Sequence, residues 1–489
     1  MTIDMLPDDV LVEIFNSFVN VYNQRRYIRR NTWHALVRVC RRWRYLVFAS
    51  PRSLNLRLNY SGHGPMSEIP DTWLIFPVVL VSSLVGHLNS GQRWDNMASA
   101  LESEHHNRIS EIHIFDITES RWERFAAAMQ KPFPELTSLR VWLDFGDRDL
   151  LSVLPDSFLG RSVPRLRELR LRSIPFPSIT TLLLSAKSLV TLSLWNIPDS
   201  GYISPDAMAT AFTAMTTLET LRLSFRSPRS RPNPASRPLH LPTRFVLPAL
   251  TELEFNGVYE YLEGLLARID VPALYKLIII FFMDLDFDLP HLHRLIGHAE
   301  EFKALDQATV LILNRSIQLS IYPKTGVVDH HSLLNLQIIC EELDQQISSL
   351  AQVCRSSFPL VSAMEDLQIW EDDHRLLSSP LAVNMETGQW LELLDPFTAL
   401  KNLHLTETIA AHVCSALQEL SGERVTEVLP TLQRLFIDSP SSYSLPEGLR
   451  KAIKTFVDAR RRSGHPVSVH CTYWIGRSMD ITEDLVSGD

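Results

Sequence analysis

The chain has 489 residues, of which 45% are hydrophobic and 21% charged, and its formal net charge at pH 7 is −9. This composition is typical of a folded soluble protein and excludes a chain that is disordered over most of its length. Its length fits two or three domains or one extended repeat array. The five cysteines are scattered without a Cys-x-x-Cys pair, which argues against a disulfide framework or a zinc module. We therefore expect a reducing compartment, cytoplasmic or nuclear.

Neither a secretory leader nor a membrane helix is expected from the sequence. Met1 leads directly into an amphipathic segment, without a basic and apolar leader. The longest apolar stretch, residues 74–85, contains Pro77 and is well short of the roughly 20 residues that a membrane helix needs. We interpret this stretch as a buried strand and expect no membrane contact.

Two apolar blocks near the N-terminus predict short helices that share a small core. Pro7 fits the first turn of a helix, where its missing N–H is not needed, and Asp8 and Asp9 complement the positive end of the helix dipole. Apolar residues then recur at helical spacing in both blocks: Leu11, Ile14, Phe15 and Phe18 in the first, and Leu36, Val39, Cys40, Trp43 and Val47 in the second. About fifty residues rarely make an independent core, so a partner or the rest of the chain should complete it.

The order and spacing of these blocks resemble an F-box, the motif by which a substrate receptor binds the Skp-type adaptor of an SCF ubiquitin ligase. The resemblance implies an F-box domain over residues 1–50 and adaptor contacts from Leu6, Pro7, Leu11, Ile14, Phe15, Leu36, Val39, Cys40 and Trp43. The spacer between the blocks, residues 19–33, is longer and richer in arginine than in a compact F-box. The alternative is an ordinary helical hairpin that caps a larger fold.

Charge is uneven along the first part of the chain. Between Glu13 and Glu68 there is no acidic residue, while ten arginines lie between Arg25 and Arg57. This segment could be a patch for an acidic protein surface or for nucleic acid, or simply the solvated face of helices. No zinc finger or aromatic RNA-binding motif accompanies the arginines, so nucleic acid is not the expected partner.

From residue 109 onward one phrase recurs, in which apolar residues occupy the first, fourth and sixth positions. Its copies begin at Ile109, Leu136, Leu166, Leu189, Leu218, Leu250, Leu274, Met364, Leu400 and Leu432. A period near 30 residues is typical of a solenoid, in which each strand-plus-helix unit buries its faces against its neighbours. The long interval between the copies at Leu274 and Met364 predicts degenerate repeats over residues 284–358.

The predicted fold class is α/β: a small all-helical F-box followed by an irregular leucine-rich-repeat-like solenoid of parallel strands alternating with helices. We expect the solenoid over residues 51–473, with an exposed Pro- and Arg-rich loop at 224–243 and a flexible tail at 474–489. Helices are expected at residues 179–186, 205–215, 260–269, 333–353 and 449–462. The position that usually holds asparagine, eight after the first leucine, holds Asp144, Ile174, Ile197 or Val258. Two α/β domains with unrelated strands are the alternative.

The sequence lacks the motifs of common enzymes. No Gly-x-Gly-x-x-Gly, phosphate-binding loop, Gly-x-Ser-x-Gly or His-Glu-x-x-His occurs, and 17 glycines give few close backbone approaches. Asp284, Asp286 and Asp288 superficially match a calcium loop, but Leu289 and Leu295 stand where glycine and glutamate are required. We expect no cofactor, no metal site and no catalytic activity, with a hydrolase as a distant alternative.

Together the F-box and the repeats resemble the large fungal, basidiomycete-type family of F-box proteins, over nearly the full length. The resemblance implies a substrate receptor bound to a Skp-type adaptor and cullin. In a leucine-rich array the strand residues between the leucines face the concave side, where exposed Arg and Trp are typical interface hot spots. We expect an acidic or phosphorylated protein substrate to contact Arg140, Trp142, Arg170, Arg172, Trp195, Arg222 and Trp370. Alternatively, the tryptophans pack under loops and the arginines solubilise the surface, or the array binds proteins outside the ligase.

Overall fold

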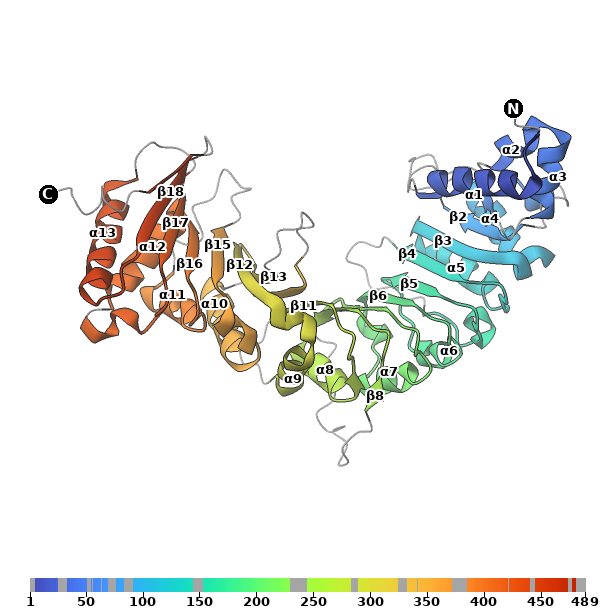
Figure 1. Cartoon of the computed structure of the whole chain (residues 1–489). Helices are drawn as coiled ribbons and strands as arrows, with labels where there is room; N and C mark the ends of the chain where they lie inside the picture. Colours follow the sequence, from blue (N-terminus) through green and yellow to red (C-terminus); the bar gives the residue numbers. More distant parts are fainter. Residues whose placement is uncertain are drawn as a thin grey trace. The chain divides into compact units, whose positions relative to one another are not determined.

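The computed structural model describes most of the chain (Figure 1). The described residues are 5–24, 33–50, 54, 56–62, 64–68, 76–82, 91–143, 153–228, 244–282, 289–323, 332–340, 342–371, 385–420, 422–439, 445–473 and 477–480. The chain divides into unit 1, formed by Met1–Ile203 and Thr210–Leu218, and unit 2, formed by Ser204–Ala209 and Glu219–Asp489. This division does not coincide with the expected boundary at residue 50. That the first fifty residues are a separate domain stays a prediction.

Unit 1 begins with three helices, α1 (Asp8–Gln24), α2 (Trp33–Val39) and α3 (Arg41–Ala49). They form where the two apolar blocks predict helices. Their shared core contains Leu11 and Phe15 from α1 together with Leu46 and Val47 from α3, all at most 6% exposed. The ring of Phe15 packs against Trp43 with a centroid distance of 4.7 Å.

The rest of unit 1 is a parallel sheet whose strands pair in sequence order. The strands are β1 (Leu58–Tyr60), β2 (Val78–Val81), β3 (Ile109–Ile117), β4 (Ser138–Leu143), β5 (Glu168–Arg172) and β6 (Thr191–Ile197). The expected buried strand within residues 74–85 is β2. The connections contain α4 (Gly91–Glu102), α5 (Glu119–Ala128) and α6 (Ile179–Leu183), which lie on one side of the strands (Figure 1), and the short helices η2 (Met66–Glu68), η4 (Glu104–Arg108), η5 (Phe158–Arg161) and η6 (Asp199–Gly201).

Each repeat phrase begins with a buried residue, which lies in the turn before the strand in every copy but the one at Ile109, the first residue of β3. Leu166, which begins one phrase, is 0% exposed, and Leu169 and Leu171 of the following strand are buried as well. Two residues after Leu171 the backbone turns with positive φ at Ser173, and the next residue, Ile174, is buried again. Asp116 and Asn196 have positive φ at the corresponding positions of β3 and β6. A left-handed residue followed by a buried apolar one thus occupies the place of the usual asparagine ladder.

Helix α7 (Pro205–Phe212) has residues in both units. In unit 2 the parallel strands β7 (Thr220–Phe225), β9 (Glu252–Gly257) and β11 (Lys276–Phe282) pair in order, and β8 (Phe245–Val246) pairs with β10 (Ile269–Asp270). At the C-terminal end the parallel order resumes with β15 (Asp366–Glu371), β16 (Asn402–Thr406), β17 (Arg434–Ser439) and β18 (Ser468–Tyr473), and β19 (Arg477–Asp480) pairs antiparallel to β18.

Between these two runs the strand order reverses. The strands are β12 (Leu305–Leu313), β13 (Ser316–Pro323) and β14 (Leu334–Ile339). Strand β14 pairs with β11 and β12 pairs with β15, both in parallel, while β13 is antiparallel to β12 and β14 on either side. The order of strands across the sheet is therefore β11, β14, β13, β12, β15. After β11 the chain first forms the distant strand β12, returns through β13, and only then places β14 beside β11. The degenerate parallel repeats expected over residues 284–358 are wrong in this respect.

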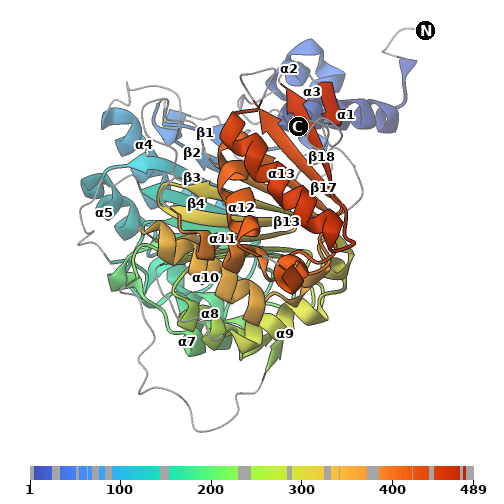
Figure 2. The same ribbon diagram turned by 90° about the vertical axis from the view of Figure 1, so that its left-hand side faces the viewer.

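Helices of unit 2 cover one side of its strands; Figure 2 shows α12 and α13 in front of β17. They are α8 (Tyr259–Leu266), α9 (Pro290–His298), α10 (Leu343–Ser356), α11 (Thr387–Leu394), α12 (Glu407–Gln418) and α13 (Glu447–Arg462), with the short helices η8 (Glu300–Ala304), η9 (Pro359–Ala363) and η11 (Gly422–Thr426). None of the helices in the described part of the chain is long and apolar enough to cross a membrane.

Three expected elements need correction. The helix expected at 333–353 is wrong in its first half, because Leu334, Leu336 and Ile338 alternate with half-buried residues in strand β14 before α10 begins. Residues 477–480, expected within a flexible tail, form β19. The loop expected at 224–243 starts later, since β7 continues to Phe225; its residues 229–243 lie outside the described part.

Candidate binding surfaces

The three N-terminal helices expose large apolar side chains to solvent. These residues form what we term the N-terminal patch: Met5 (73% exposed), Val10 (39%), Ile14 (42%), Val39 (58%) and Tyr45 (71%). Val10 and Ile14 are one turn apart on α1 and so lie on the same side of that helix. Several large exposed apolar residues within three short helices and the segment before them indicate a surface that is covered by a partner.

The segment before α1 is tied to α3 by one arginine. Arg42 Nη2 donates to the carbonyl oxygen of Leu6 (2.6 Å) and to Oδ1 of Asp8 (2.6 Å). At the start of α3, Cys40 Sγ accepts the backbone N–H of Trp43 (3.4 Å) as the N-cap. Leu6 is half-buried and Pro7 exposed. The beginning of the chain is thereby held against the same helices that carry the N-terminal patch.

The residues for which the resemblance implies adaptor contacts divide into two groups. Leu11 and Phe15 are 0% exposed and Leu36 is 5% exposed, so they build the helical core. Pro7, Ile14 and Val39 are exposed, and Leu6, Cys40 and Trp43 are half-buried. Only the second group can touch a partner in this conformation; whether it does stays a prediction.

The second candidate surface is the face of the unit 1 sheet opposite the buried leucines, which we term the outer face of unit 1. The strand register places its side chains in rows that run across the strands. The middle row is His113, Arg140, Arg170 and Ser193, and the outer row is Phe115, Trp142, Arg172 and Trp195. Five of the residues expected to bind substrate are therefore neighbours in two adjacent rows.

A chain of polar contacts engages most of the charged groups on this face. Glu168 is at its centre: Oε2 accepts from Arg140 Nη2 (2.6 Å) and from Ser138 Oγ (2.9 Å), and Oε1 is paired with Arg170 Nε (2.5 Å). Ser138 Oγ also lies 3.1 Å from Nε2 of the buried His113. Beyond it Glu111 is 3.5 Å from His113 and forms an ion pair with Arg57.

This arrangement keeps Glu168 ionised. Burial acts to raise the pKa of its carboxyl, but the hydrogen bond from Arg140 and the positive charges of Arg140 and Arg170 outweigh burial, so that the pKa lies below its ordinary value. Arg140 and Arg170 thus already share a carboxylate of their own chain. Sequence reasoning missed Glu168, although its place two residues before Arg170 in the same strand puts both side chains on one face.

The outer row combines aromatic rings with one cation. Phe115 and Trp142 meet edge to face with a centroid distance of 4.7 Å. Arg172 is exposed and lies in register between Trp142 and the half-buried Trp195. Arg172 forms no ion pair with any residue that the structure describes. The alternative that these tryptophans are packed away from solvent holds only in part, because neither indole is fully buried.

The two remaining expected substrate residues belong to unit 2. Arg222 on β7 is paired with Glu254 (3.1 Å) and Glu252 (3.5 Å) on β9. Trp370 on β15 is 40% exposed, and its Nε1 donates to Oε1 of Gln368 (3.3 Å). Farther along unit 2, His404 stacks on Phe436 (4.3 Å between centroids) and Phe436 on His470 (5.1 Å).

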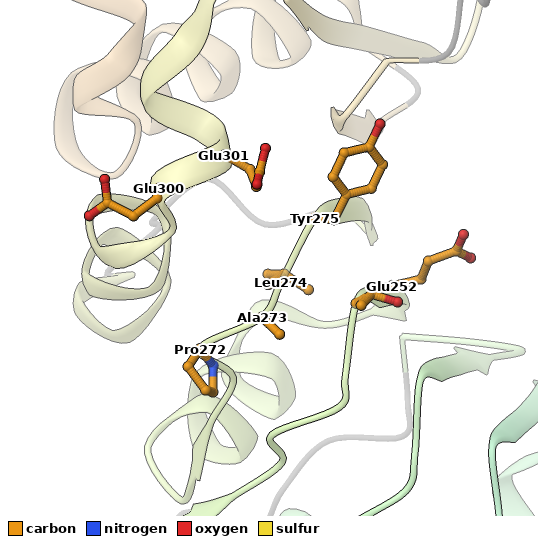
Figure 3. A pocket seen from close by; sticks show the side chains of 8 residues that line it. Glu252, Pro272, Ala273, Leu274, Tyr275, Glu300 and Glu301 are labelled. Atoms are coloured by element: carbon orange, nitrogen blue, oxygen red, sulfur yellow. The ribbon is translucent and has the colours of Figure 1, made fainter.

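Unit 2 also has an open cleft of about 560 Å³. Figure 3 shows Glu300 and Glu301 on one side, Tyr275 and Leu274 on the segment leading into β11, and Glu252 beyond them. Tyr275 is 48% exposed, and Glu300 is engaged by Lys303 Nζ (2.5 Å). The lining of the cleft is acidic and offers few reactive groups: it contains carboxylates and a phenol but no cysteine, histidine or lysine.

The described residues hold no group of three or more His, Cys, Asp or Glu side chains arranged for a metal ion. The calcium-like segment with Asp284 lies outside the described part. Four of the cysteines are buried, and burial raises the pKa of Cys354 and Cys414 to about 12. These thiols are therefore protonated at neutral pH and are poor nucleophiles.

Comparisons with known proteins identify no relative in sequence. No family model matches the chain, and no curated protein matches it. Among solved structures, the chain is similar to the leucine-rich repeat-containing protein LegL7 from Legionella pneumophila, with 12% identity, a TM-score of 0.28, and coverage of 82% of this chain and 97% of that one. The mixed α/β repeat fold described above is established by the strand pairing and burial of this chain itself: parallel strands alternating with helices in a leucine-rich-repeat-like array, interrupted once by the β12–β13 hairpin.

Proposed function

We propose that this chain is an F-box substrate-recognition subunit of an SCF-type ubiquitin ligase. The N-terminal patch would bind the Skp-type adaptor, which links it to the cullin, and the repeat region would bind a protein substrate. The chain itself would do no chemistry; it would raise the effective concentration of a substrate lysine near the charged conjugating enzyme. The observation that supports this proposal is the exposure of Ile14 on α1 and Val39 on α2, two of the positions at which the F-box resemblance implies adaptor contacts.

A large apolar side chain that is exposed in the free protein is expected at the centre of a protein interface, because it loses its contact with water when the partner binds. Ile14 and Val39 are exposed by 42% and 58% although the helices have a core of their own. Their exposure therefore cannot be explained by packing within α1–α3. Arg42, which fastens Leu6 and Asp8 to α3, would fix the first residues in the orientation that the adaptor meets.

The test is co-purification of the tagged full-length chain with the Skp-type adaptor and cullin. Ile14→Glu combined with Val39→Glu should abolish recovery of the adaptor, because two charges would be buried at the interface. Both positions are exposed, so the variant should fold. Val246→Glu in β8 of unit 2, where Val246 is 53% exposed, is the matched control and should recover the adaptor like wild type.

A second comparison uses Leu6→Ala with Pro7→Ala, which truncates two side chains of the segment held by Arg42 and should also reduce recovery of the adaptor. Adaptor recovery by the Ile14/Val39 variant at the wild-type level would overturn the F-box assignment. So would failure of the wild-type chain to recover any adaptor. In either case the repeat region would be treated as a protein-binding scaffold outside the ligase, which keeps the outer face of unit 1 but not the N-terminal patch.

Binding of nucleic acid by the arginine-rich segment is supported less well. Arg42 is paired with Asp8, Arg44 Nε donates to the carbonyl oxygen of Val37 (3.0 Å), and Arg57 is paired with Glu111. Guanidinium groups that are engaged within the chain are not available to phosphates. Arg25 to Arg30 lie outside the described residues. A steep salt dependence of binding to DNA or RNA, roughly −0.9 in log–log slope per phosphate neutralised, would revive this alternative.

For the substrate, we propose the outer face of unit 1 as the binding surface. It carries Arg140, Trp142, Arg170, Arg172 and Trp195 in two adjacent rows. Arginine and tryptophan are the residue types that contribute most to binding energy at interfaces. The positive charge on Arg172, which no described carboxylate of the chain neutralises, favours an acidic partner.

A further inference from the structure

We infer that the outer row of unit 1 recognises an unphosphorylated acidic segment of its protein partner, in which one Asp or Glu is flanked two residues away on each side by an apolar residue. The inference rests on the proposed role of the outer face as the substrate surface. It assigns the contact with the acid to Arg172 and the apolar contacts to Trp142 and Trp195.

The arginines differ in whether a carboxylate of the chain itself is paired with them, and this difference assigns their roles. Arg140 and Arg170 both contact Glu168, and Arg57 contacts Glu111. These three guanidinium groups therefore have a carboxylate within the chain. Arg172 is the exposed arginine of the outer face that forms no ion pair with a described residue. Arg140 and Arg170 are positioning residues, which fix the sheet face around Glu168, whereas Arg172 is oriented toward a partner.

The charge available at Arg172 fits a carboxylate rather than a phosphate. One guanidinium forms two parallel hydrogen bonds with one carboxylate. A phosphoserine carries between about −1.5 and −2 charges and three acceptor oxygens, and it is typically bound by a cluster of arginines. Here the neighbouring Arg140 already donates to Glu168, and Arg170 forms an ion pair with it. A phosphate would have to share both guanidinium groups with Glu168, whose negative charge opposes its binding.

The spacing of the flanking residues follows from the strand geometry. Adjacent strands lie about 4.8 Å apart, so Trp142 and Trp195 lie about 5 Å to either side of Arg172 along the row. In an extended peptide lying across the strands, side chains on the same side recur every second residue, about 6.7 Å apart. With the acid on Arg172, the residues two before and two after it are within reach of the two indole rings.

The inference is tested with a displayed library of random twelve-residue peptides, selected on the immobilised full-length chain. The enriched peptides should share the pattern apolar-x-acidic-x-apolar. The most enriched peptide is then made with its acid as the carboxylate, as the corresponding amide and as phosphoserine. The amide should bind about tenfold more weakly or worse, because Arg172 loses its charged partner. The phosphoserine peptide should bind no more tightly than the carboxylate peptide.

Variants of the chain locate the contact. Arg172→Ala and Trp142→Ala should each weaken binding of the selected peptide about tenfold or more, and Arg172→Lys should have a smaller effect because it keeps the charge. Arg165→Ala is the matched control: Arg165 is exposed in the turn before β5, is paired with Glu135, and should have no effect. Circular dichroism and thermal melting confirm that each variant is folded.

Four outcomes would overturn the inference: no enrichment over a surface without the chain, enriched peptides without the shared pattern, undiminished binding by Arg172→Ala, or tighter binding of the phosphoserine peptide. The selection uses the chain alone and needs no adaptor. Its failure beside successful adaptor recovery would refute the assigned specificity and leave the ligase assignment intact. If the selection yields peptides with the shared pattern but the chain does not recover the adaptor, the peptide site is supported and the assignment to the ligase is refuted.

Discussion

Asn196 donates a hydrogen bond from Nδ2 to Oγ of Ser173 (2.7 Å), and both residues have positive φ, 55° and 59°. Asn196 is the second-last residue of β6 and Ser173 follows β5 directly, and the two occupy the same position of two consecutive repeats. In each repeat the next residue, Ile197 or Ile174, returns to the core with 5% exposure. The polar contact between repeats therefore lies one residue before the position at which an asparagine ladder is usually found, and that position is apolar.

This geometry makes a specific prediction for Asn196. Asn196→Gly keeps the left-handed backbone and loses one hydrogen bond, so it should lower the free energy of unfolding by about 1 kcal/mol. Asn196→Val should cost about 1–2 kcal/mol more, because a β-branched side chain is strained at this φ. Urea unfolding of the two variants measures the difference. Ser188→Val, in an exposed loop of the same unit, should stay within about 0.5 kcal/mol of wild type; equal values for Gly and Val would contradict the explanation.

The buried guanidinium of Arg460 makes a second prediction. Its side chain on α13 is 1% exposed and donates to the carbonyl oxygens of Val425 (3.2 Å), Leu429 (3.2 Å) and Leu432 (3.3 Å). Arg460→Met fills similar space but leaves these acceptors unsatisfied, so the unfolding free energy of unit 2 should fall by about 3 kcal/mol. Arg461→Met, at an exposed position of the same helix, should be nearly neutral. The denaturant midpoints of the two variants, compared with that of the wild type, measure these changes in stability.

Glu263 provides a third prediction, because it caps a helix other than its own. Its two carboxylate oxygens accept the backbone N–H groups of His291 (2.9 Å) and Leu292 (2.8 Å) in the first turn of α9. Glu263→Ala removes these acceptors and the favourable interaction with the helix dipole, at a cost of about 1–2 kcal/mol. Hydrogen exchange should then accelerate locally in α9. Glu301→Gln, on an exposed side chain nearby in sequence, should leave exchange in α9 unchanged.

A fourth prediction concerns acid stability in unit 2. Burial lowers the pKa of His404 below its ordinary value of 6.5, and the charge of Arg434 acts in the same direction, against the opposing effects of Asp366 and Asp438. The unfolded chain therefore takes up this proton at a higher pH than the folded chain does. The contribution of His404 to stability is complete above pH 6.5 and is lost as the pH falls through the folded pKa.

His404→Phe keeps a flat ring to stack on Phe436 and cannot be protonated. Its stability should fall less than that of wild type between pH 6.5 and the lower folded pKa, while the two proteins should differ little in pH dependence above pH 7. Urea midpoints measured across this range provide the test. His465→Gln replaces an exposed histidine and should retain the wild-type profile; an identical acid slope for His404→Phe would refute this assignment.

The repeat phrase predicted most strands of both units with the correct inward residues. Leu139, Leu169 and Leu192 are each 0% exposed, as alternation within a strand requires. The residues between them form the outer face. The phrase succeeds because each strand is buried on one face only, so that period-2 alternation appears in the sequence.

The same reasoning failed between β11 and β15. Residues 333–353 contain apolar residues at both strand and helix spacing, and residues 334–339 alternate between buried and half-buried as a strand requires. The hairpin β12–β13 was detectable, since two alternating apolar runs flank the two turn residues Asn314 and Arg315. Its pairing was not, because nothing local indicates that β12 and β14 exchange places.

The sequence predicted the placement of five candidate residues on one face of the sheet; that they bind a substrate stays a prediction. The register brought Arg140, Trp142, Arg170, Arg172 and Trp195 together as expected from the phrase. That Glu168 neutralises two of these arginines depends on side-chain distances, which spacing alone does not give. The burial of Leu11, Phe15 and Leu36, against the exposure of Ile14 and Val39, likewise follows from how three helices cross.

The exchanged positions of β12 and β14 affect how the repeat region can fold. In a regular solenoid each repeat contacts only its neighbours, and its stability is close to a sum of nearest-neighbour terms. Here β11 obtains its second neighbour, β14, only after the chain has passed through β12 and β13, and β12 obtains its parallel partner only when β15 is made. Residues 276–371 should therefore form as one cooperative block. Removal of a single repeat length from this block would leave two strands without partners, so modular shortening that other repeat proteins tolerate should fail here.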